Sequence, residues 1–268
     1  MGARPLPSRP LKETASDGLA PSEVIYDGHW SQVGRLRDET GRGFIRKVGK
    51  FPLQPDGLAV VEFLHALSAQ PQPNLLIPER FTGEVGALLV EDYLDLTGQP
   101  RLDTIGHELR SGLAGGARSL AQIVDFVVQL SDAVGFIHRT GFVHQDVRAR
   151  NVFVGTEGER LIPILFDYTF IVRPFFLIEG RLIADLEAPP EVRVGYVKLD
   201  ARYDVYQLGW MLRNLTHYEA GPDLWRPVAT LGDGLETVIA RATGPLAQRH
   251  PTAAALRDDL HGLDSTSN

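Results

Sequence analysis

The apolar side chains that follow residue 119 recur at alternating spacings of three and four positions; they are Leu120, Ile123, Val127, Leu130, Val134 and Ile137. This spacing aligns them on one face of an α-helix, which predicts a long buried helix. Ser119 and Gln122 are a candidate capping box at its start, and Gly141 is a candidate stop at its end. A buried helix of this length requires a sizeable core around it.

The segments on either side of this helix follow different patterns. Before it come the strand-like segments EVIYDG, SQVGRL, GFIRKV and ALLVEDYL, interrupted by the helical segment GLAVVEFLHALSA. After it come two short apolar strands, VFV and PILF, and helical patterns around Val205 to Leu215, LETVIARAT and TAAALRDDL. We therefore predict a two-lobed α+β fold, with a small sheet and one helix followed by a larger, mainly helical lobe.

Charge and residue content exclude several classes of partner. The net charge of −7 argues against a nucleic-acid partner that relies on electrostatic attraction to phosphates. The chain holds no cysteine, so disulfides and thiolate metal sites are excluded, and any metal must bind oxygen or histidine. The N-terminal segment lacks an apolar signal core, and we expect no membrane-spanning stretch among the later residues. We expect a cytoplasmic protein without a nucleic-acid or membrane partner.

A run of polar residues, HQDVRARN, lies between the long helix and the two short strands. Polar groups are costly when buried without a partner, so such a run indicates a loop that faces a cleft. Asp146 and Asn151 lie five residues apart, and Asp167 ends the second strand. Two carboxylates and an amide can hold Mg²⁺ together with phosphate oxygens, or one carboxylate can accept a proton from an attacking hydroxyl. Arg148 adds a cation that could offset charge on a transferring phosphoryl group.

The run HQDVRARN followed by DYT resembles the catalytic loop and the metal-binding motif of the protein kinase superfamily, whose usual forms are HRDxxxxN and DFG. APPEV, which contains Glu191, resembles the end of the kinase activation segment. DVYQLGWML resembles the central helix of the large lobe, with Asp204 at the position that braces the catalytic loop. Arg249 resembles the late arginine that pairs with the activation-segment glutamate. The resemblance spans about residues 24 to 262.

The resemblance implies a two-lobed protein kinase-like fold whose small lobe is an antiparallel β-sheet with one helix. We expect a disordered leader over residues 1–22, the small lobe over 23–93, the large lobe over 94–263 and a tail over 264–268. The implied cofactors are ATP and Mg²⁺. The implied partners are ATP, a protein or small-molecule hydroxyl acceptor, and a regulatory protein.

The resemblance also implies a role for each site residue. Asp146 takes the proton from the hydroxyl group that receives the phosphoryl group, and Arg148 supports the phosphoryl group during transfer. Asn151 and Asp167 hold Mg²⁺. Lys47, in FIRKV, orients the ATP phosphates and is held by Glu62. The other implied ATP contacts come from a degraded glycine-rich loop, the strands beside it, the hinge VEDYL and the strand VFV; they are Gly28, Ser31, Val33, Ile45, Glu91, Tyr93 and Phe153. In the alternative interpretation Lys47 and Glu62 are solvated charges, and Lys50 offers another register.

Departures from the family pattern leave three functions open. Gln145 replaces the usual arginine of the catalytic loop, and Thr169 replaces the final glycine of the metal motif. The leading hypothesis is a kinase that acts on serine or threonine hydroxyls of proteins. The alternatives are a small-molecule phosphotransferase and a pseudokinase that binds nucleotide or a partner without turnover.

The activation segment suggests how activity is controlled. From Phe170 to Glu191 it contains no serine, threonine or tyrosine, so we predict that activity does not depend on phosphate there. We expect the segment to be ordered constitutively or by a bound partner. Its apolar run FFLI would either pack against the large lobe or offer a partner surface.

Overall fold

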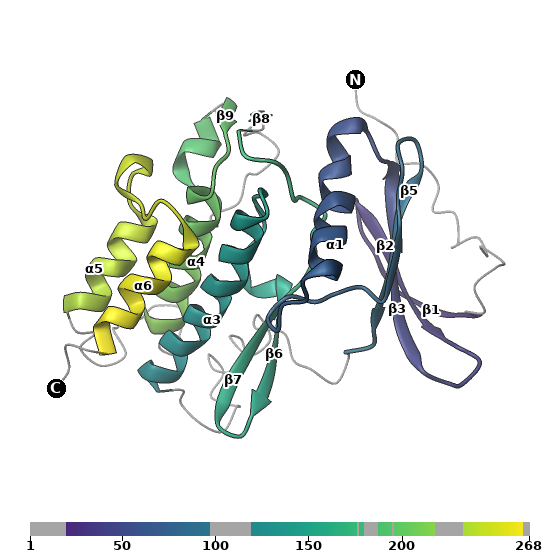
Figure 1. Ribbon diagram of the computed structural model, residues 1–268, viewed down its shortest axis with the longest axis horizontal. Helices are drawn as coiled ribbons and strands as arrows, with labels where there is room; N and C mark the ends of the chain where they lie inside the picture. Colours follow the sequence, from purple (N-terminus) through teal and green to yellow (C-terminus); the bar gives the residue numbers. More distant parts are fainter. Residues whose placement is uncertain are drawn as a thin grey trace. The chain divides into compact units, whose positions relative to one another are not determined.

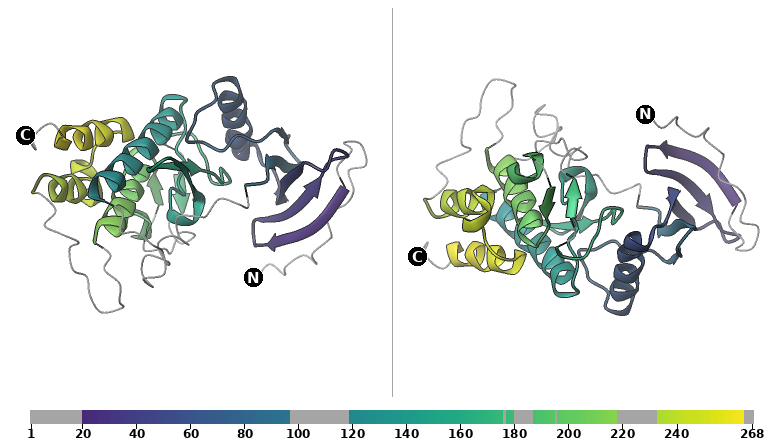
Figure 2. Two further views of the ribbon diagram at one scale, coloured as in Figure 1. Left: turned by 90° about the horizontal axis from the view of Figure 1, so that it is seen from below. Right: turned by 90° about the horizontal axis from the view of Figure 1, so that it is seen from above.

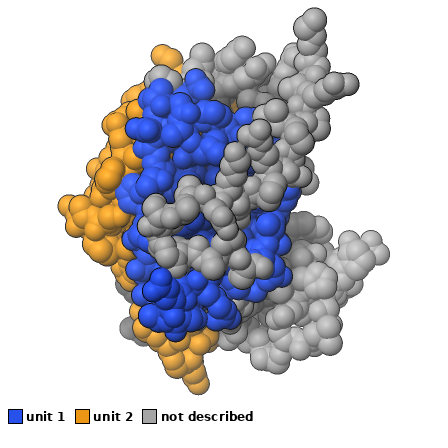
Figure 3. All heavy atoms as spheres, turned by 90° about the vertical axis from the view of Figure 1, so that its right-hand side faces the viewer, with its two compact units in different colours: residues 1–55, 78–96 blue, residues 56–77, 97–268 orange. Residues whose placement is uncertain are grey.

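The computed structural model describes residues 20–96, 119–175, 177–179, 187–194, 196–217 and 233–264. The chain divides into two compact units, coloured blue and orange in Figure 3. Unit 1 comprises residues 1–55 and 78–96, and unit 2 comprises residues 56–77 and 97–268. Most of the predicted leader and tail, residues 1–19 and 265–268, lies outside the described residues.

Unit 1 is built on a five-stranded antiparallel sheet in the order β1-β2-β3-β5-β4 (Figure 1). Its strands are β1 (Ala20–Asp27), β2 (Ser31–Arg37), β3 (Gly43–Pro52), β4 (Arg80–Thr82) and β5 (Leu88–Leu94). The predicted small antiparallel sheet is therefore confirmed. The sequence patterns missed β4, because three residues are too few to show an alternation.

β1 begins earlier than the sequence suggested. Pro21 pairs with Leu36 of β2, so the boundary expected at residue 22 lies inside a strand. The residues around it are charged and proline-rich, which resembles a leader in composition. Pairing with β2 orders them because it satisfies their backbone groups.

Unit 2 contains the described α-helices and the remaining strands. Its helices are α1 (Ala59–Ala69), α3 (Leu120–Arg139), α4 (Arg202–His217), α5 (Asp233–Thr243) and α6 (Ala253–Asp264). Two antiparallel pairs accompany them: β6 (Val152–Glu157) with β7 (Arg160–Leu165), and β8 (Leu177–Glu179) with β9 (Tyr196–Lys198). Short 3-10 turns occur at η1 (Pro55–Leu58), η2 (Ala149–Asn151), η4 (Pro190–Val194) and η5 (Leu246–Gln248). Together with the sheet of unit 1, these elements confirm the predicted α+β class.

α3 is the central helix of unit 2, as the apolar spacing predicted. Gln122 donates its backbone N–H to Ser119 Oγ at 3.2 Å, and Ser119 donates its backbone N–H to Gln122 Oε1 at 2.9 Å, which confirms the capping box. Gly141 follows the helix with a φ of 86°, the left-handed conformation that glycine adopts readily. In Figures 1 and 2, α3 lies beside α4 and α6, and it contacts both helices and β7.

By length and composition alone, α3 could cross a membrane, contrary to our expectation of no such stretch. In its most apolar 18-residue window, 67% of the residues are buried inside the protein. The side chains of Val127, Leu130, Val134 and Ile137 have no exposed surface. The apolar content of α3 is therefore explained by its place in a protein core.

α1 groups with unit 2, whereas its place in the sequence predicted that it belongs to the small lobe. Phe63 of α1 contacts the ring of Tyr168 edge-on at 4.9 Å and that of Phe142 at 5.7 Å. Further along, Leu76 donates its backbone N–H to the carbonyl of Leu165 at 2.8 Å. Aromatic packing and backbone pairing thus join residues 56–77 to the rest of unit 2. Residue spacing within one segment cannot reveal such contacts, because the two partners are far apart in the sequence.

Candidate catalytic site

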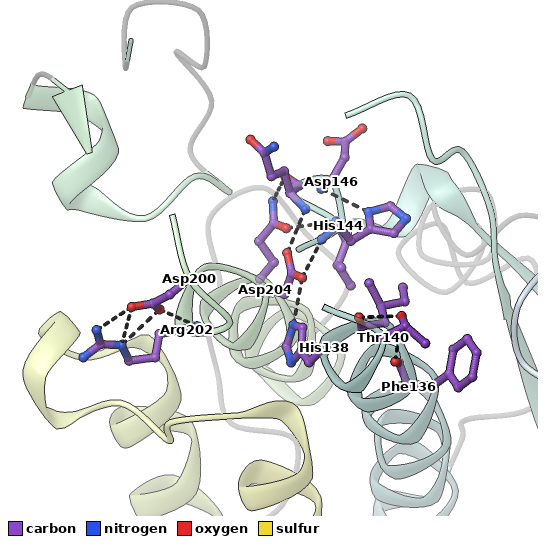
Figure 4. A network of polar contacts seen from close by, with 12 residues as sticks. Phe136, His138, Thr140, His144, Asp146, Asp200, Arg202 and Asp204 are labelled. Carbon is purple, nitrogen blue, oxygen red and sulfur yellow. Dashed lines mark hydrogen bonds and ion pairs between the residues drawn. The ribbon is translucent and has the colours of Figure 1, made fainter. Parts of the chain in front are cut away.

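The loop between α3 and β6, residues 141–151, is fixed by a buried carboxylate. Asp204, in the first turn of α4, has no exposed surface. Its Oδ2 accepts the backbone N–H of His144 and its Oδ1 that of Gln145, both at 2.8 Å. His138 Nε2 lies 3.0 Å from the same Oδ2 (Figure 4). Hydrogen bonds to an ionised acceptor are stronger than neutral ones, so the predicted brace of the loop by Asp204 is confirmed.

Gln207 is a second brace, which the sequence motifs did not predict. Its Oε1 accepts the backbone N–H of Val147 at 2.9 Å, and its Nε2 donates to the carbonyl of Gln145 at 3.0 Å. Gln207 lies three residues after Asp204, so both side chains project from the same face of α4. The available signal was this i, i+3 pair of polar residues within the largely apolar stretch DVYQLGWML.

Gln145 adopts a strained backbone conformation. Its φ is 69°, in the left-handed region that non-glycine residues rarely occupy. The brace from α4 holds its backbone, and its side-chain Nε2 donates to the carbonyl of Phe170 at 2.6 Å. Val143 and Val172 exchange backbone hydrogen bonds of 2.8 and 3.0 Å beside it. The loop is therefore joined to the start of the activation segment by backbone and side-chain contacts.

Asp146 and Asn151 come together at the end of this loop. Both are 5% exposed, and Asn151 Nδ2 donates to the Asp146 backbone carbonyl at 2.9 Å and to its Oδ2 at 2.6 Å. Both hydrogen bonds use the amide nitrogen of Asn151. Its amide oxygen thus remains the ligand atom that the side chain can offer a metal. The structure brings together the proposed proton acceptor and one proposed metal ligand.

Arg148 contacts the other side of the Asp146 carboxylate. Its Nε pairs with Asp146 Oδ1 and lies 3.5 Å from Glu187 Oε2, and the residue is only 6% exposed. A buried cation needs partners, and these two carboxylates supply them. Because Asn151 holds one oxygen of Asp146 and Arg148 the other, the carboxylate is fixed in direction.

Asp167, Tyr168 and Thr169 stand where the family pattern has DFG, and the side chain of Thr169 contacts that of Asp167. Asp167 has a φ of 67°, and its Oδ1 accepts the Thr169 hydroxyl at 2.6 Å and the Thr169 backbone N–H at 3.2 Å. Tyr168 has no exposed surface, and its hydroxyl donates toward the carbonyls of Leu76 at 2.9 Å and Leu165 at 3.1 Å. Its contact with Phe63 packs this aromatic residue against α1. Thr169 therefore anchors the carboxylate of Asp167.

The end of the activation segment is held by the predicted ion pair. Arg249 NH1 and NH2 contact the two carboxylate oxygens of Glu191 at 2.5 and 2.8 Å, and the arginine side chain is fully buried. The guanidinium carbon also lies 4.8 Å from the centre of the Tyr206 ring. Residues 176 and 180–186 lie outside the described residues, so the order of the complete segment stays a prediction.

The apolar run FFLI is only partly described. Phe175 is 69% exposed, so it does not pack against unit 2 as the first of our two expectations proposed. Its backbone N–H donates to the carbonyl of Leu199 at 2.5 Å, and β8 pairs with β9 beyond it. Backbone pairing here determines the position of the chain without burying this side chain.

The ATP contacts expected in unit 1 share one face of its sheet. Val33 and Glu91 are both cross-strand partners of Lys47, and Ile45 is the partner of Tyr93. Directly opposed residues project on the same face, so the register gathers all five side chains there. The register also places the backbone of Glu91 between β3 and β4, where it belongs to the sheet ladder. The adenine contacts expected of the hinge VEDYL, Glu91 and Tyr93 included, stay a prediction.

The remaining expected contacts lie in the β1–β2 turn and in β6. Gly28 donates its backbone N–H to the carbonyl of Ser31 at 3.0 Å. A Cβ at Gly28 would lie 2.1 Å from the Tyr26 hydroxyl, so a larger residue there would displace this exposed ring. In unit 2, Phe153 stacks on Phe166 at 4.3 Å.

The charged pair expected of Lys47 and Glu62 joins residues of different units and stays a prediction. Within unit 1, Lys47 Nζ lies 3.8 Å from Glu91 Oε2, and its side chain is only 11% exposed. Lys47 is therefore not the solvated lysine of the alternative interpretation. Within unit 2, Glu62 pairs with Arg173 at 2.6 Å, and its side chain is half exposed. Lys50, which offered the other register, pairs with Asp27.

Comparisons with known proteins agree with this geometry. Residues 56–164 match the family described as protein tyrosine and serine/threonine kinase. The kinase domain of PknI from Mycobacterium tuberculosis superposes with a TM-score of 0.59 at 17% identity, covering 91% of this chain and 96% of that one. The chain therefore has the protein kinase fold, and residues 56–164 match the kinase family. A second superfamily structure, the kinase PK-1 of Cydia pomonella granulovirus, gives a TM-score of 0.67 at 13% identity, covering 89% and 92% of the two chains.

Relatives within the protein kinase superfamily are also found by sequence. Cyclin-dependent kinase 12 of Caenorhabditis elegans is 32% identical over 94 residues, which are 35% of this chain and 13% of that protein. Serine/threonine-protein kinase 16 of Mus musculus is 26% identical over 157 residues, 53% of this chain and 49% of that protein. The chain thus spans less than half the length of these curated relatives.

Proposed function

We propose that this protein is a protein kinase that transfers the γ-phosphoryl group of ATP, with Mg²⁺, to serine or threonine hydroxyls. The observation that carries the proposal is the arrangement around Asp146. Its two carboxylate oxygens contact Asn151 and Arg148. Asp204 holds the loop by accepting two of its backbone N–H groups. A buried, oriented carboxylate is suited to accept a proton from an attacking hydroxyl.

The residues fit a magnesium ion completed by phosphate oxygens. Mg²⁺ prefers oxygen ligands and is commonly bound through one or two protein groups plus substrate phosphates. The Asp167 carboxylate and the Asn151 amide oxygen are ligands of this kind. The described residues contain no group of three or more His, Cys, Asp or Glu side chains that could hold a metal alone, which agrees with a site that needs the nucleotide. Bound there, the ion would neutralise charge on the phosphates.

The other residues of the site position reactants and balance charge. Lys47 would contact the phosphates of ATP from the face of the sheet that also carries Val33 and Ile45. Arg148, already directed at Asp146, would support the phosphoryl group during transfer. Kinases gain rate chiefly from such positioning and electrostatic stabilisation. Glu187 adds a carboxylate beside Arg148 and limits how far the arginine can move.

One observation favours a nucleotide-binding protein without turnover. The Thr169 hydroxyl donates to Asp167 Oδ1 at 2.6 Å, and this hydrogen bond competes with a metal for the same oxygen. Asp167 has a second carboxylate oxygen, so metal binding is compatible with this bond. A measurement of phosphoryl transfer from ATP distinguishes a kinase from a nucleotide-binding protein without turnover.

The test is to incubate the purified chain with γ-labelled ATP and Mg²⁺, with and without acceptor proteins such as casein and myelin basic protein. We expect label on serine or threonine after acid hydrolysis. Label that reaches only added small-molecule alcohols would support the small-molecule phosphotransferase. Binding of ATP with no label transfer to any acceptor or to the chain itself would support the pseudokinase.

A further inference from the structure

Glu91 lies in the interior of the sheet of unit 1, beside the lysine expected to contact phosphate. β5 pairs with β3 on one side, where Glu91 is opposite Lys47, and with β4 on the other, where it is opposite Phe81. The Glu91 side chain is 1% exposed and that of Lys47 is 11% exposed. A carboxylate removed from water in this way needs a cation or hydrogen bonds to compensate it.

Both oxygens of the Glu91 carboxylate have a partner. Tyr93 donates its hydroxyl hydrogen to Oε1 at 2.5 Å, and Lys47 Nζ lies 3.8 Å from Oε2. The lysine distance is longer than a hydrogen bond, so this contact is an attraction between charges. Away from water such an attraction is only weakly screened. The tyrosine determines where the carboxylate points, and the carboxylate attracts the lysine.

We propose that Glu91 is the positioning residue that holds Lys47 in its charged form on the face of the sheet that carries the expected ATP contacts. The role in catalysis rests on the proposed kinase function, whereas the ion pair itself does not. In the family pattern this role falls to Glu62. Here Glu62 pairs with Arg173 in unit 2, and both side chains are about half exposed, at 49% and 61%. The lysine therefore has a counter-ion within its own sheet.

A neighbouring ion pair supplies a matched control. Arg46 and Asp92 are each one residue away from Lys47 and Glu91, so they lie on the opposite face of the same strands. Their atoms are 2.7 Å apart, and their side chains are 10% and 5% exposed. Asp92→Asn removes a buried carboxylate from β5, as Glu91→Gln does, without removing a charge beside Lys47.

The experiment measures how Lys47 reacts with an amine-specific acylating reagent as a function of pH, read by mass spectrometry of its peptide in the intact 268-residue protein. Only the uncharged amine reacts. In Glu91→Gln we expect the midpoint of the profile to move to lower pH by about one unit, because an adjacent negative charge favours the charged lysine. Asp92→Asn should leave the midpoint in place. An unmoved midpoint in folded Glu91→Gln, or a larger shift in Glu62→Gln, would overturn the proposal.

A second measurement decides the question if Glu91→Gln does not fold alone. Lys47→Met leaves the Glu91 carboxylate buried without its cation. Adding Glu91→Gln to Lys47→Met should then raise the thermal unfolding midpoint, because a buried charge that has lost the attraction of Lys47 is removed. A further fall in the midpoint would contradict the pairing.

The catalytic consequence is tested with ATP turnover. We expect kcat/KM for ATP to fall at least about tenfold in Glu91→Gln, with partial recovery in Glu91→Asp, which restores the charge. An unchanged kcat/KM in an otherwise active enzyme would overturn the positioning role. If the wild-type protein itself shows no turnover, the proposed function fails, and the reactivity profile still decides whether Glu91 holds Lys47.

Discussion

The side-chain amide of Gln145 donates a hydrogen bond to the backbone carbonyl of Phe170, 2.6 Å away. Gln145 occupies the position at which many kinases carry an arginine that receives an activation-segment phosphate. A neutral amide cannot form a charged pair with phosphate, but here it contacts the activation segment directly. The contact supports the prediction that order at the start of this segment does not require phosphorylation.

Treatment with a broad-specificity phosphatase is therefore expected to leave activity unchanged. No serine, threonine or tyrosine occurs from Phe170 to Glu191, and Tyr168 is fully buried with its hydroxyl hydrogen-bonded. The assay is label transfer before and after treatment, with intact mass to confirm that any phosphate was removed. A large loss of activity that maps to Tyr168 or Thr169 would refute the prediction. A loss that maps to residues 1–19 would indicate a regulatory site outside the segment.

Asp204→Asn is expected to weaken the catalytic loop. The carboxylate accepts two backbone N–H groups, whereas an asparagine side chain offers one oxygen and directs an N–H₂ group at the other donor. Hydrogen bonds to a charged group contribute about 1.5–3 kcal/mol each, so we expect a loss of that order in the free energy of unfolding. Chemical denaturation measures it, and turnover should fall in parallel. Asp132→Asn, at an exposed ion pair with Arg257, is the control and should change little.

Arg249→Lys should destabilise unit 2 although it keeps the charge. The guanidinium group contacts both oxygens of Glu191, also donates through Nε to the carbonyl of Gly244 at 2.8 Å, and lies over the Tyr206 ring. A lysine cannot reproduce this planar arrangement. We expect the free energy of unfolding to fall by about 3 kcal/mol, as when a buried pair is broken. A thermal unfolding midpoint equal to that of the wild type would show that this pair does not support the fold.

His250 is expected to make stability depend on pH. Burial lowers the pKa of His250 below its ordinary value of 6.5, opposed by a hydrogen bond from the ring to Asp259 at 2.9 Å and helped by the charge of Arg241. Below pH 6.5 the unfolded chain therefore takes up a proton that the folded protein binds only at lower pH. The free energy of unfolding should fall as the pH drops below about 6.5 and recover as it rises above this value.

His250→Asn isolates this contribution, because asparagine does not titrate. Denaturation at several pH values between about 5 and 7.5 should give a flatter profile for the variant than for the wild type. The same pH dependence in both proteins would assign it to other groups.

Local sequence patterns predicted the elements of the fold that depend on local chemistry. The capping box of Ser119 and Gln122, the stop at Gly141 and the core face of α3 follow from rules that act within a few residues. The family resemblance added two long-range contacts, those of Asp204 with the loop and of Arg249 with Glu191. These contacts were predictable only because the motifs around Asp204 and Arg249 identify which position of the family pattern each residue occupies.

The missed features depend on which strands and helices become neighbours. Glu91 and Lys47 are opposed only because β3 pairs with β5, and this register is not visible in either segment alone. α1 joins unit 2 through Phe63, whose aromatic partners lie far along the chain. Gln207 resembles any helix-surface glutamine until the loop is placed against α4. A polar residue at a buried helical position is the signal that could have identified it.

The most direct test of the proposed function compares label transfer from ATP by the wild-type protein, Asp146→Asn and Asp167→Ala, with Mg²⁺ and with excess EDTA. We expect Mg²⁺-dependent transfer by the wild type. Asp146→Asn should bind Mg-ATP nearly as well but transfer phosphate at least about 10²-fold more slowly, because the proton acceptor is lost. Asp167→Ala should lose Mg-ATP binding and turnover together, because a metal ligand is lost. Transfer at the wild-type rate by both variants would contradict the assignment of this site.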